Sequence, residues 1–258
     1  MASTACKVYH KDGFDSRTFL ETYFSSKPDM VYADDTLKYP MKKLREIFSA
    51  GHIKGNVLID ISLGPFIHHL LTASTIFKDI YLLRFREECI MELSRWLNTR
   101  TGAFEWNHAK SYLDELDGGS DQCEDKETKM KSAINHIVKW DIDTDTVPVV
   151  LPAADCVITA WLLDTISTDQ DDYITNLKKI TKFVGPGCHL ILIGALNASY
   201  FTVVNEKFHI FNYDEAFVRK ALTGEGFVID HCDIFTRESV SDLSDHGAII
   251  FITAHIEK

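Results

Sequence analysis

The chain alternates short apolar runs with amphipathic segments, and this alternation limits its possible folds more than any single motif does. The segments between the runs place apolar side chains three and four residues apart, as amphipathic helices do. Strand–helix–strand units of this kind form parallel sheets with right-handed crossovers. The pattern therefore predicts an α/β fold with an open, mostly parallel sheet and helices on both faces. The expected strands are residues 56–61, 79–85, 138–142, 154–163, 189–196, 227–235 and 246–256.

The pattern divides the chain into a helical start and an α/β remainder. Residues 16–49 are expected to form helices before the first strand, because "SRTFLETYF" and "YPMKKLREIF" space their aromatic and leucine side chains at helical intervals. With 258 residues and 45% hydrophobic content, the chain is long enough to bury one large core. We therefore expect a single domain, with residues 1–50 as an N-terminal helical cap and residues 51–258 as an α/β core.

Charge and composition argue against several kinds of partner. The chain carries 27 Lys and Arg against 38 Asp and Glu, and the resulting net charge of −11 repels a nucleic-acid backbone. It has no start that resembles a signal peptide and no run of about 18 apolar residues. These features predict no nucleic-acid partner, no membrane span and, by default, a cytoplasmic location. The six cysteines lack close pairs, which favours free thiols over a disulfide framework or a zinc site.

The stretch "VLIDISLGPFIHHLL" (residues 57–71) begins like the first strand and turn of a nucleotide-binding domain. Its apolar run ends in Asp60, but the turn continues as Ser-Leu-Gly-Pro (residues 62–65), so only the second glycine of a G-x-G turn is present. Ligands of such sheets bind beyond the carboxyl ends of the strands. A ribose there usually meets a carboxylate about 20 residues after the turn, and this chain has Arg84 in that place.

Segments spread over nearly the whole chain resemble the nicotinamide, indolethylamine and phenylethanolamine N-methyltransferases. The segments are "YHKDGFDSRTFLETYF", "LIDISLGPFIHHLLTA", "LPAADCVITAWLLD", "GALNASYF" and "NEKF", in this order. These enzymes are S-adenosylmethionine-dependent class I methyltransferases that act on small amines and pyridines. The resemblance implies a Rossmann-like sheet, mostly parallel with an antiparallel C-terminal strand, and extra N-terminal helices. It also implies S-adenosylmethionine as the cofactor.

Part of the family pattern is retained in this chain. In the family, the position of Asp141 lies beside the adenine of the cofactor, and the positions of Gly64 and Pro65 border the cofactor. By resemblance, the cofactor-binding positions are Tyr9, Tyr23, Asp60, Gly64, Pro65, Asp141 and Ile142. The resemblance likewise implies a substrate pocket at Phe19, Trp161, Ala195, Ser199 and Tyr200.

The departures from the family pattern gather where the ligands would be touched. Arg84 replaces the ribose-binding acid, and Gly194 replaces the acid that holds the nitrogen end of the substrate. The remaining replacements remove small or polar groups, so a more apolar and fuller pocket is expected. They are Ser62 and Leu63 for a glycine and a small polar residue, Cys89 for an asparagine near the ribose, and Phe19, Phe24 and His68 for tyrosines.

Arg84 has two interpretations. Its guanidinium can donate to ribose hydroxyls, although it brings a positive charge near the sulfonium of the cofactor. Alternatively, it turns outward and pairs with Glu87 or Glu88 on the following helix. In both cases the ribose loses its carboxylate acceptor, and two hydrogen bonds to a charged group contribute about 3 to 6 kcal/mol.

Three further side chains have structural as well as functional interpretations. Trp161 either fills space left by a lost ligand or stacks on a new flat ligand. The segment "GPFIHHLLTAS" predicts a helix with Pro65 in its first turn. His68 and His69 are neighbours on this helix and therefore point about 100° apart, so we expect no metal site there.

Three hypotheses for function follow. The first is a diverged methyltransferase with a vestigial or weak cofactor site and no catalytic residue, whose fold is retained for binding, structural or storage purposes. The second is an active S-adenosylmethionine-dependent amine N-methyltransferase with a rebuilt site, supported by the retained cofactor-site positions. The third is a module that binds another apolar or anionic small molecule, with Arg84 and Arg86 facing the anion.

Overall fold

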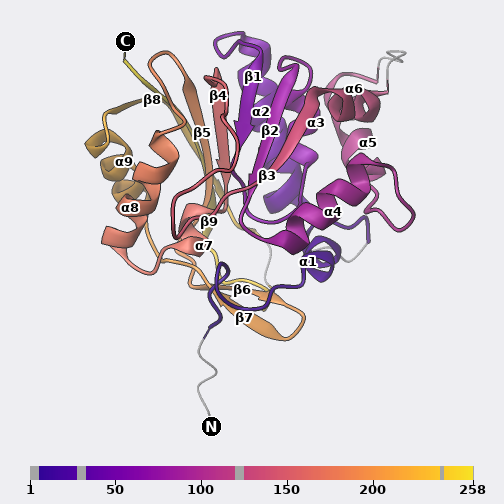
Figure 1. The fold of residues 1–258 in the computed structure, drawn as a ribbon. Coiled ribbons are helices and arrows are strands. Elements are labelled where there is room, and N and C mark those ends of the chain that lie inside the picture. Colours follow the sequence, from indigo (N-terminus) through magenta and orange to yellow (C-terminus); the bar gives the residue numbers. More distant parts are fainter. Residues whose placement is uncertain (1–5, 28–32, 120–124, 239–240, 258) are drawn as a thin grey trace.

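A seven-stranded mixed sheet forms the centre of the molecule (Figure 1). The computed structural model describes residues 6–27, 33–119, 125–238 and 241–257. The strand order is β3-β2-β1-β4-β5-β9-β8; the first five strands are parallel, whereas β9 is antiparallel to β5 and to β8. This topology confirms the predicted α/β class and its antiparallel C-terminal strand. The strands are β1 (Val57–Asp60), β2 (Asp79–Arg84), β3 (Ile134–Lys139), β4 (Cys156–Ala160), β5 (His189–Leu196), β8 (Phe227–Thr236) and β9 (Ala248–Ile256).

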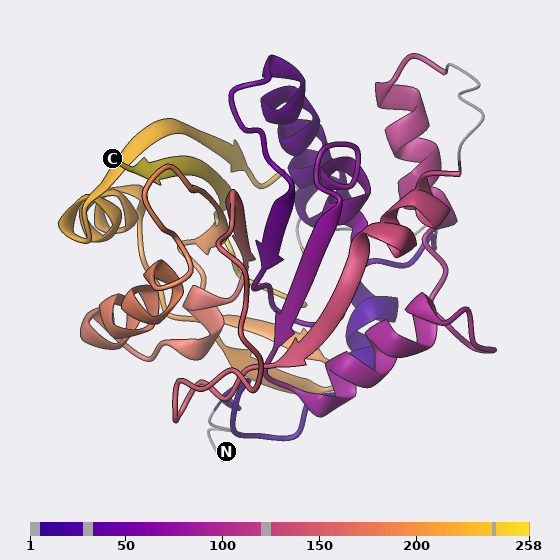
Figure 2. The ribbon, with the colours of Figure 1, turned by 45° about the horizontal axis from the view of Figure 1, so that its top comes forward.

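Helices lie beside both halves of the sheet. In Figure 2, α8 and α9 lie beside the half of the sheet that ends in β8, whereas α4, α5 and α6 lie beside the half that ends in β3. No helix among the described residues is long and apolar enough to cross a bilayer. The helices are α1 (Ser16–Tyr23), the π-helix η1 (Ala33–Lys38), α2 (Tyr39–Ala50), α3 (His68–Ala73), α4 (Glu87–Leu97), α5 (Asn107–Leu116), α6 (Lys126–Ala133), α7 (Leu163–Ile166), α8 (Gln170–Thr181) and α9 (Glu215–Gly224).

Local sequence signals explain where several helices begin and end. Asp15, Asp169 and Asp214 precede α1, α8 and α9, and each carboxylate accepts a backbone N–H of the first turn. Helix α2 has Pro40 in its first turn and ends at Gly51, whose φ of 73° lies in the left-handed region that glycine favours. These residues therefore set the limits of the four helices.

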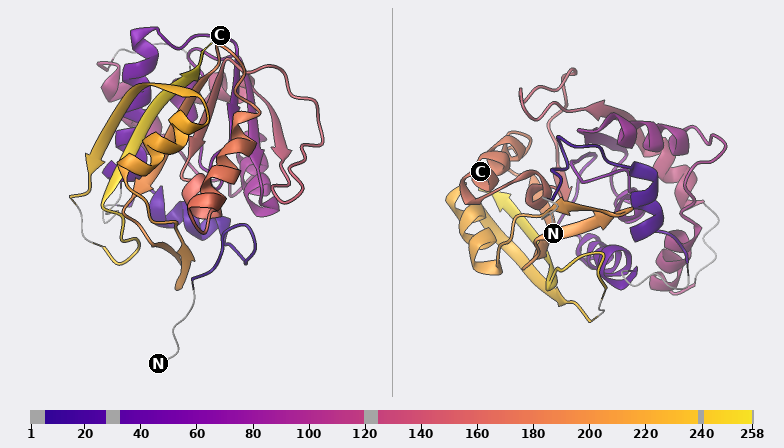
Figure 3. Two further views of the ribbon diagram at one scale, coloured as in Figure 1. Left: turned by 90° about the vertical axis from the view of Figure 1, so that its left-hand side faces the viewer. Right: turned by 90° about the horizontal axis from the view of Figure 1, so that it is seen from below.

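The N-terminal segment and a small hairpin close over the carboxyl ends of the parallel strands. The hairpin consists of β6 (Tyr200–Val203) and β7 (Glu206–His209), and it lies with α1 at the lower end of the molecule in Figures 1 and 3. The hydroxyl of Tyr23 on α1 donates to the carbonyl of Thr202 on β6 (2.9 Å). The amide of His209 donates to the carbonyl of Lys7 (2.8 Å). Contacts across this end therefore join parts of the chain about 200 residues apart.

The structure differs from the sequence prediction at several elements. The predicted 154–163 strand is only Cys156–Ala160, and Leu163 already begins α7. Helix α3 begins at His68 rather than at Pro65, because the chain first continues beside β4 through a bond from Leu63 N to the carbonyl of Ala160 (2.9 Å). Strand β3 begins four residues earlier than the predicted 138–142 strand and ends before it does. The hairpin β6–β7 was not predicted, since its strands are four residues each and carry a weak apolar pattern.

Candidate functional site

The turn after β1 is held from two sides. Beyond β1, Ile61 N donates to the carbonyl of Ile158 on β4 (2.8 Å), so the turn starts as an extension of the sheet. Gly64 then adopts a φ of 68°, which glycine reaches without strain. The ring of Phe19 on α1 lies so close that a Cβ at position 64 would be 2.7 Å from it. Glycine is therefore required here both for its backbone conformation and for the packing of α1.

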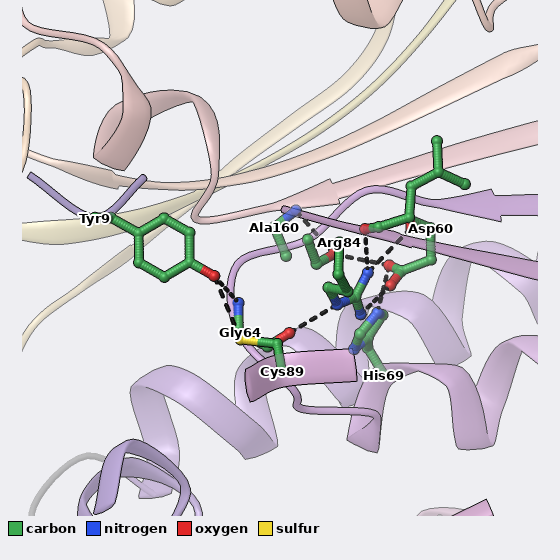
Figure 4. A network of polar contacts seen from close by, with 9 residues as sticks. Tyr9, Asp60, Gly64, His69, Arg84, Cys89 and Ala160 are labelled. Atoms are coloured by element: carbon green, nitrogen blue, oxygen red, sulfur yellow. Dashed lines mark hydrogen bonds and ion pairs between the residues drawn. The ribbon is translucent and has the colours of Figure 1, made fainter. Parts of the chain in front are cut away.

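Arg84, the last residue of β2, turns inward and lies fully buried across this turn (Figure 4). Its Nε donates to the carbonyl of Gly64 (2.7 Å), and its Nη1 donates to the carbonyl of Asp60 (3.1 Å). Its Nη2 lies 2.6 Å from Oδ2 of Asp60. The predicted alternative of an outward Arg84 paired with Glu87 or Glu88 is wrong, because its guanidinium is consumed by β1 and the turn.

Asp60 is the centre of this polar network. Its Oδ1 lies 2.7 Å from Nε2 of His69 and accepts the hydroxyl of Ser62 at 2.7 Å. Ser62 Oγ also accepts the backbone N–H of Ala160 (3.2 Å). Burial alone would raise the pKa of Asp60, but the charges of Arg84 and His69 and the hydrogen bonds hold the pKa well below its usual range. Asp60 is thus an ionised carboxylate whose buried counter-ion is Arg84.

A second polar chain ties the N-terminal segment to the same turn. The backbone N–H of Gly64 donates to the hydroxyl of Tyr9 (3.2 Å). That hydroxyl lies 3.5 Å from Sγ of Cys89 on α4, and Oγ of Ser16 lies 3.4 Å from the same sulfur. Burial raises the pKa values of the Tyr9 phenol and the Cys89 thiol. Tyr9 therefore joins Gly64 to Cys89, and the family pattern places all three of these positions at the cofactor site.

Asp141 and Ile142 follow β3 at the same end of the sheet. The carboxylate of Asp141 is exposed and accepts the backbone N–H groups of Asp143 (3.0 Å) and Thr144 (3.1 Å). These bonds lower its pKa. Ile142 is buried, and its carbonyl accepts Nζ of Lys179 (3.0 Å). The carboxylate of Asp141 thus caps its own loop.

An apolar cavity of about 60 Å³ lies between α1 and the carboxyl ends of β4 and β5. Three positions that the family pattern assigns to the substrate contribute to it, namely Phe19, Trp161 and Ala195. Tyr23, assigned to the cofactor, and the altered Leu63 line it as well. The other lining residues are Phe24, Thr36, Asp164, Thr165, Phe201, Ile210, Ser244, His246 and Ile249.

The structure places the two remaining substrate-pocket positions elsewhere. Ser199 N donates to Oδ1 of Asp245 (2.8 Å), and its hydroxyl contacts the other carboxylate oxygen. The ring of Tyr200 carries Nζ of Lys207 at 3.5 Å from its centroid. Neither Ser199 nor Tyr200 lines the cavity.

Asp164 on α7 is a cavity residue, although its place after an apolar run did not mark it as an obvious replacement for the missing substrate acid. It is buried, and its Oδ2 accepts the backbone N–H of Ala195 (3.0 Å). Burial raises the pKa of Asp164 to about 6. Its partner Ala195 directly follows Gly194 on β5, and a Cβ added at position 194 would collide with the hydroxyl of Tyr213. The position of Asp164 just after the strand β4, at the edge where ligands bind, was the signal that could have identified it.

Trp161, His68 and His69 take part in packing and in the Asp60 network. Trp161 is half-buried, and its ring meets Phe66 edge-on at 5.4 Å between centroids. His68 is fully buried and stacks on Trp106 at 5.9 Å, whereas His69 contacts Asp60. Burial and the neighbouring His69 lower the pKa of His68 well below its usual value. Within the described ranges, no three His, Cys, Asp or Glu side chains are grouped as metal ligands would be.

Arg86 does not face an open site either. Its Nη1 donates to the carbonyls of Tyr9 (3.1 Å) and Asp12 (2.6 Å), and so holds the N-terminal segment. Since Arg84 is bound to Asp60 and Gly64, the hypothesis that both arginines receive an anion lacks one of the two guanidinium groups it requires.

Comparison with known proteins agrees with this architecture. The model of the NNMT/PNMT/TEMT family matches residues 3–257. The chain is 30% identical to nicotinamide N-methyltransferase of Sus scrofa over 239 residues, which are 92% of this chain and 90% of that protein. It is 28% identical to indolethylamine N-methyltransferase of Mus musculus, over 95% of this chain and 94% of that protein. Human phenylethanolamine N-methyltransferase is 29% identical over 84% of this chain and 78% of its own length.

Solved structures of more distant proteins share the fold. The magnesium protoporphyrin IX methyltransferase ChlM of Synechocystis PCC 6803 with bound SAM superposes with a TM-score of 0.53 at 13% identity, over 93% of this chain and 90% of that chain. The glycopeptide N-methyltransferase MtfA complexed with SAM gives a TM-score of 0.55 at 9% identity, over 90% and 99% of the two chains. The chain therefore belongs to the NNMT/PNMT/TEMT family and has the class I S-adenosylmethionine-dependent methyltransferase fold.

Proposed function

We propose that this chain is a diverged member of its N-methyltransferase family in which the protein's own side chains close the cofactor site. S-adenosylmethionine then binds weakly, methyl transfer is impaired, and the fold serves a binding or structural role. The observation that carries this proposal is the buried guanidinium of Arg84, which bonds Asp60 and the carbonyl of Gly64.

The polar groups of the turn are already satisfied within the protein. The backbone N–H of Gly64 is bonded to Tyr9, its carbonyl is bonded to Arg84, and both oxygens of Asp60 have partners. Removing one partner of a buried ion pair costs about 3 to 5 kcal/mol. A cofactor that had to displace Arg84 would lose a comparable amount, which is roughly 10² to 10⁴ in affinity.

The space at the site supports the same proposal. Sites for drug-sized ligands usually enclose about 300 to 1,000 Å³. The cavity beside the turn measures about 60 Å³, and aromatic rings from α1 occupy its wall. The bonds of Arg84 and the small cavity beside the turn therefore support weak binding of S-adenosylmethionine, and we derive no chemical step through it.

The experiment that tests this proposal compares thermal unfolding with and without S-adenosylhomocysteine. A ligand at 100 times its dissociation constant stabilises by about 2.7 kcal/mol, which raises the Tm by roughly 5 to 10 °C in a protein of this size. We expect no shift for the wild type at 100 μM ligand. The variant Arg84→Gln frees the carbonyl of Gly64 without placing a second carboxylate beside Asp60, and we expect it to bind more tightly than the wild type.

The matched control is Arg95→Gln, because Arg95 is a partly exposed arginine paired with Glu92 and lies away from the turn. A wild-type Tm shift of several degrees at micromolar ligand would overturn the proposal. If Arg84→Gln folds and binds no better than the control, the turn itself or the filled pocket, rather than Arg84, limits binding.

A second candidate function is supported by the family and by Asp164. An active N-methyltransferase acting on a small amine would need Arg84 to move away, and it would need an acid to hold the substrate nitrogen. Asp164 supplies a buried carboxylate on the cavity wall. It accepts the N–H of Ala195, the residue that follows Gly194 on β5. Methyl transfer from labelled S-adenosylmethionine to a panel of small amines, lost in Asp164→Asn, would favour this candidate over the first.

A further inference from the structure

Three polar side chains form a buried hydrogen-bonded chain beside the cavity. Oγ of Ser244 lies 3.1 Å from Nδ1 of His246, and Nε2 of the same ring lies 2.9 Å from Oδ2 of Asp35. Ser244 is 6% exposed, His246 5% and Asp35 3%. Asp35 comes from η1 and the other two from the segment before β9, so this Ser–His–Asp chain joins parts of the molecule that are 211 residues apart.

Ser244 and His246 both line the apolar cavity between α1 and the carboxyl ends of β4 and β5. Their segment is held in place by other contacts. Arg237 donates from Nη1 to the carbonyl of Ser244 (2.8 Å) and from Nη2 to that of Ser241 (3.0 Å). The hydroxyl of Tyr23 lies 2.9 Å from the carbonyl oxygen of Leu243. A nucleophile needs a fixed geometry of this kind, because small displacements weaken catalysis strongly.

The contacts of the imidazole define its roles. The carboxylate of Asp35 accepts from Nε2, which keeps the ring proton on that nitrogen. Nδ1 then carries a lone pair and can accept the proton of the Ser244 hydroxyl. A base bonded to a serine and oriented by a carboxylate is the arrangement that activates serine nucleophiles, and it is recognised by geometry rather than by sequence position. Here the two ring nitrogens exchange the roles they have in chymotrypsin-like sites.

We propose that Ser244, with His246 as its base and Asp35 as the orienting residue, accepts short acyl groups from small esters. Oγ attacks the ester carbonyl and forms a new C–O bond while His246 takes the hydroxyl proton. The bond to the leaving alcohol breaks, and that alcohol receives the proton from His246. Water then hydrolyses the acyl-serine with the same base, so the net reaction is ester plus water to acid plus alcohol.

The size and character of the cavity select the acyl group. The cavity of about 60 Å³ is small beside the roughly 300 to 1,000 Å³ of sites for drug-sized ligands, which favours a short acyl group over a long chain. The surrounding wall is mainly apolar, which favours an uncharged acyl group. This activity needs neither Arg84 nor a methyl donor, and it is therefore independent of the function proposed above.

Methanesulfonyl fluoride, a small serine-directed reagent, tests the nucleophile directly. Oγ of Ser244 would form a bond to sulfur, fluoride would leave, and the hydroxyl proton would pass to His246. We expect about one methanesulfonyl group per protein molecule, located at Ser244 by peptide mass spectrometry. Labelling should be abolished in Ser244→Ala and slowed about 10² to 10⁴-fold in His246→Gln, the usual contribution of a general base. Asp35→Asn should slow it at least tenfold.

Ser241→Ala is the matched control, because Ser241 lies in the same segment and its Oγ accepts the N–H of Leu243. It should be labelled at the wild-type rate, and all variants should keep the wild-type circular dichroism spectrum. The hydrolysis of p-nitrophenyl acetate should fall at least tenfold in Ser244→Ala. A folded wild type that remains unlabelled, labelling at another residue, or ester hydrolysis unchanged in Ser244→Ala would each overturn the proposal.

Discussion

The hydroxyl of Tyr213 occupies the place where a side chain at position 194 would begin. A Cβ built on Gly194 collides with this oxygen, whereas the next nearest ring atom, Cζ, is 3.5 Å away. Both residues are buried among β5, β9 and the segment before α9. We predict that Gly194→Ala lowers the free energy of unfolding by about 1 to 3 kcal/mol, the usual cost of overpacking a core. Urea denaturation measures this change.

The same prediction has a double-mutant form. In a Tyr213→Phe background the colliding oxygen is gone, so adding Cβ at position 194 should cost much less than in the wild type. Gly185→Ala is a control, because no neighbouring atom lies within 4 Å of a Cβ there. An equal cost of Gly194→Ala in both backgrounds would contradict this account. The relationship also means that an acid restored at position 194 would require the side chain of Tyr213 to move.

Arg84 should be one of the costliest side chains to remove. We predict that Arg84→Met lowers the free energy of unfolding by about 3 to 5 kcal/mol, because it leaves the carboxylate of Asp60 buried without its main counter-ion. Adding Asp60→Asn removes that charge and should recover part of the loss. Chemical denaturation of the two single variants and the double variant measures the coupling.

The control for this cycle is Arg95→Met. The side chain of Arg95 is 42% exposed in its pair with Glu92, and exposed pairs contribute about 0 to 1 kcal/mol. If Arg84→Met cost no more than Arg95→Met, the buried pair would not have the energetic role assigned to it.

The strands could be predicted because the buried strands of this sheet are continuous apolar runs. Strand β5 has the same limits as the predicted 189–196 strand, and every residue after His189 in it is buried. By contrast, the start of α3 was placed too early, since Pro65 is typical of a first helical turn but here belongs to the turn that extends beside β4. Apolar periodicity locates an element, and hydrogen bonds to neighbours decide where it ends.

The site was predicted less completely than the fold. The sequence places Asp60 and Arg84 at the ends of adjacent parallel strands, so their proximity could be foreseen from topology. The direction of the Arg84 side chain could not, because it depends on the carbonyl of Gly64 and on the burial of Asp60. The contact of Asp35 with His246 gave no signal in the sequence, since neither residue belongs to a local motif and 211 positions separate them.

Asp164 should make stability depend on pH. Burial raises its pKa to about 6, above the usual value of about 3.9. The folded state therefore binds this proton more tightly than the unfolded state. The resulting stabilisation is complete below about pH 4 and is lost as the pH rises through 6. A difference of this size between the folded and unfolded pKa values corresponds to about 3 kcal/mol.

We predict that Asp164→Asn removes the loss of stability that the wild type shows as the pH rises through 6. Asparagine keeps an oxygen for the N–H of Ala195 and carries no charge at any pH. The free energy of unfolding of the variant minus that of the wild type should therefore be larger at pH 8 than at pH 4. Urea denaturation of both proteins at both pH values measures this difference. A difference between the two proteins that does not change with pH would contradict the raised pKa.

His68 should act in the opposite direction. Burial, assisted by the neighbouring His69 and His108, lowers its pKa well below 6.5 in the folded protein, where its ring packs against Phe24 and Trp106. The unfolded chain takes up this proton as the pH falls below about 6.5, and the folded chain does not. The stability due to neutral His68 is thus complete above that pH and is lost at up to about 1.4 kcal/mol per pH unit below it.

We predict that His68→Phe, which keeps an aromatic ring in the cluster, loses less stability than the wild type between pH 7.5 and pH 5 in urea denaturation. Replacing the exposed His52 by Phe controls for the loss of a histidine elsewhere. An unchanged pH slope in His68→Phe would mean that His68 is protonated in the folded state, and the aromatic cluster would then have to contain a buried cation.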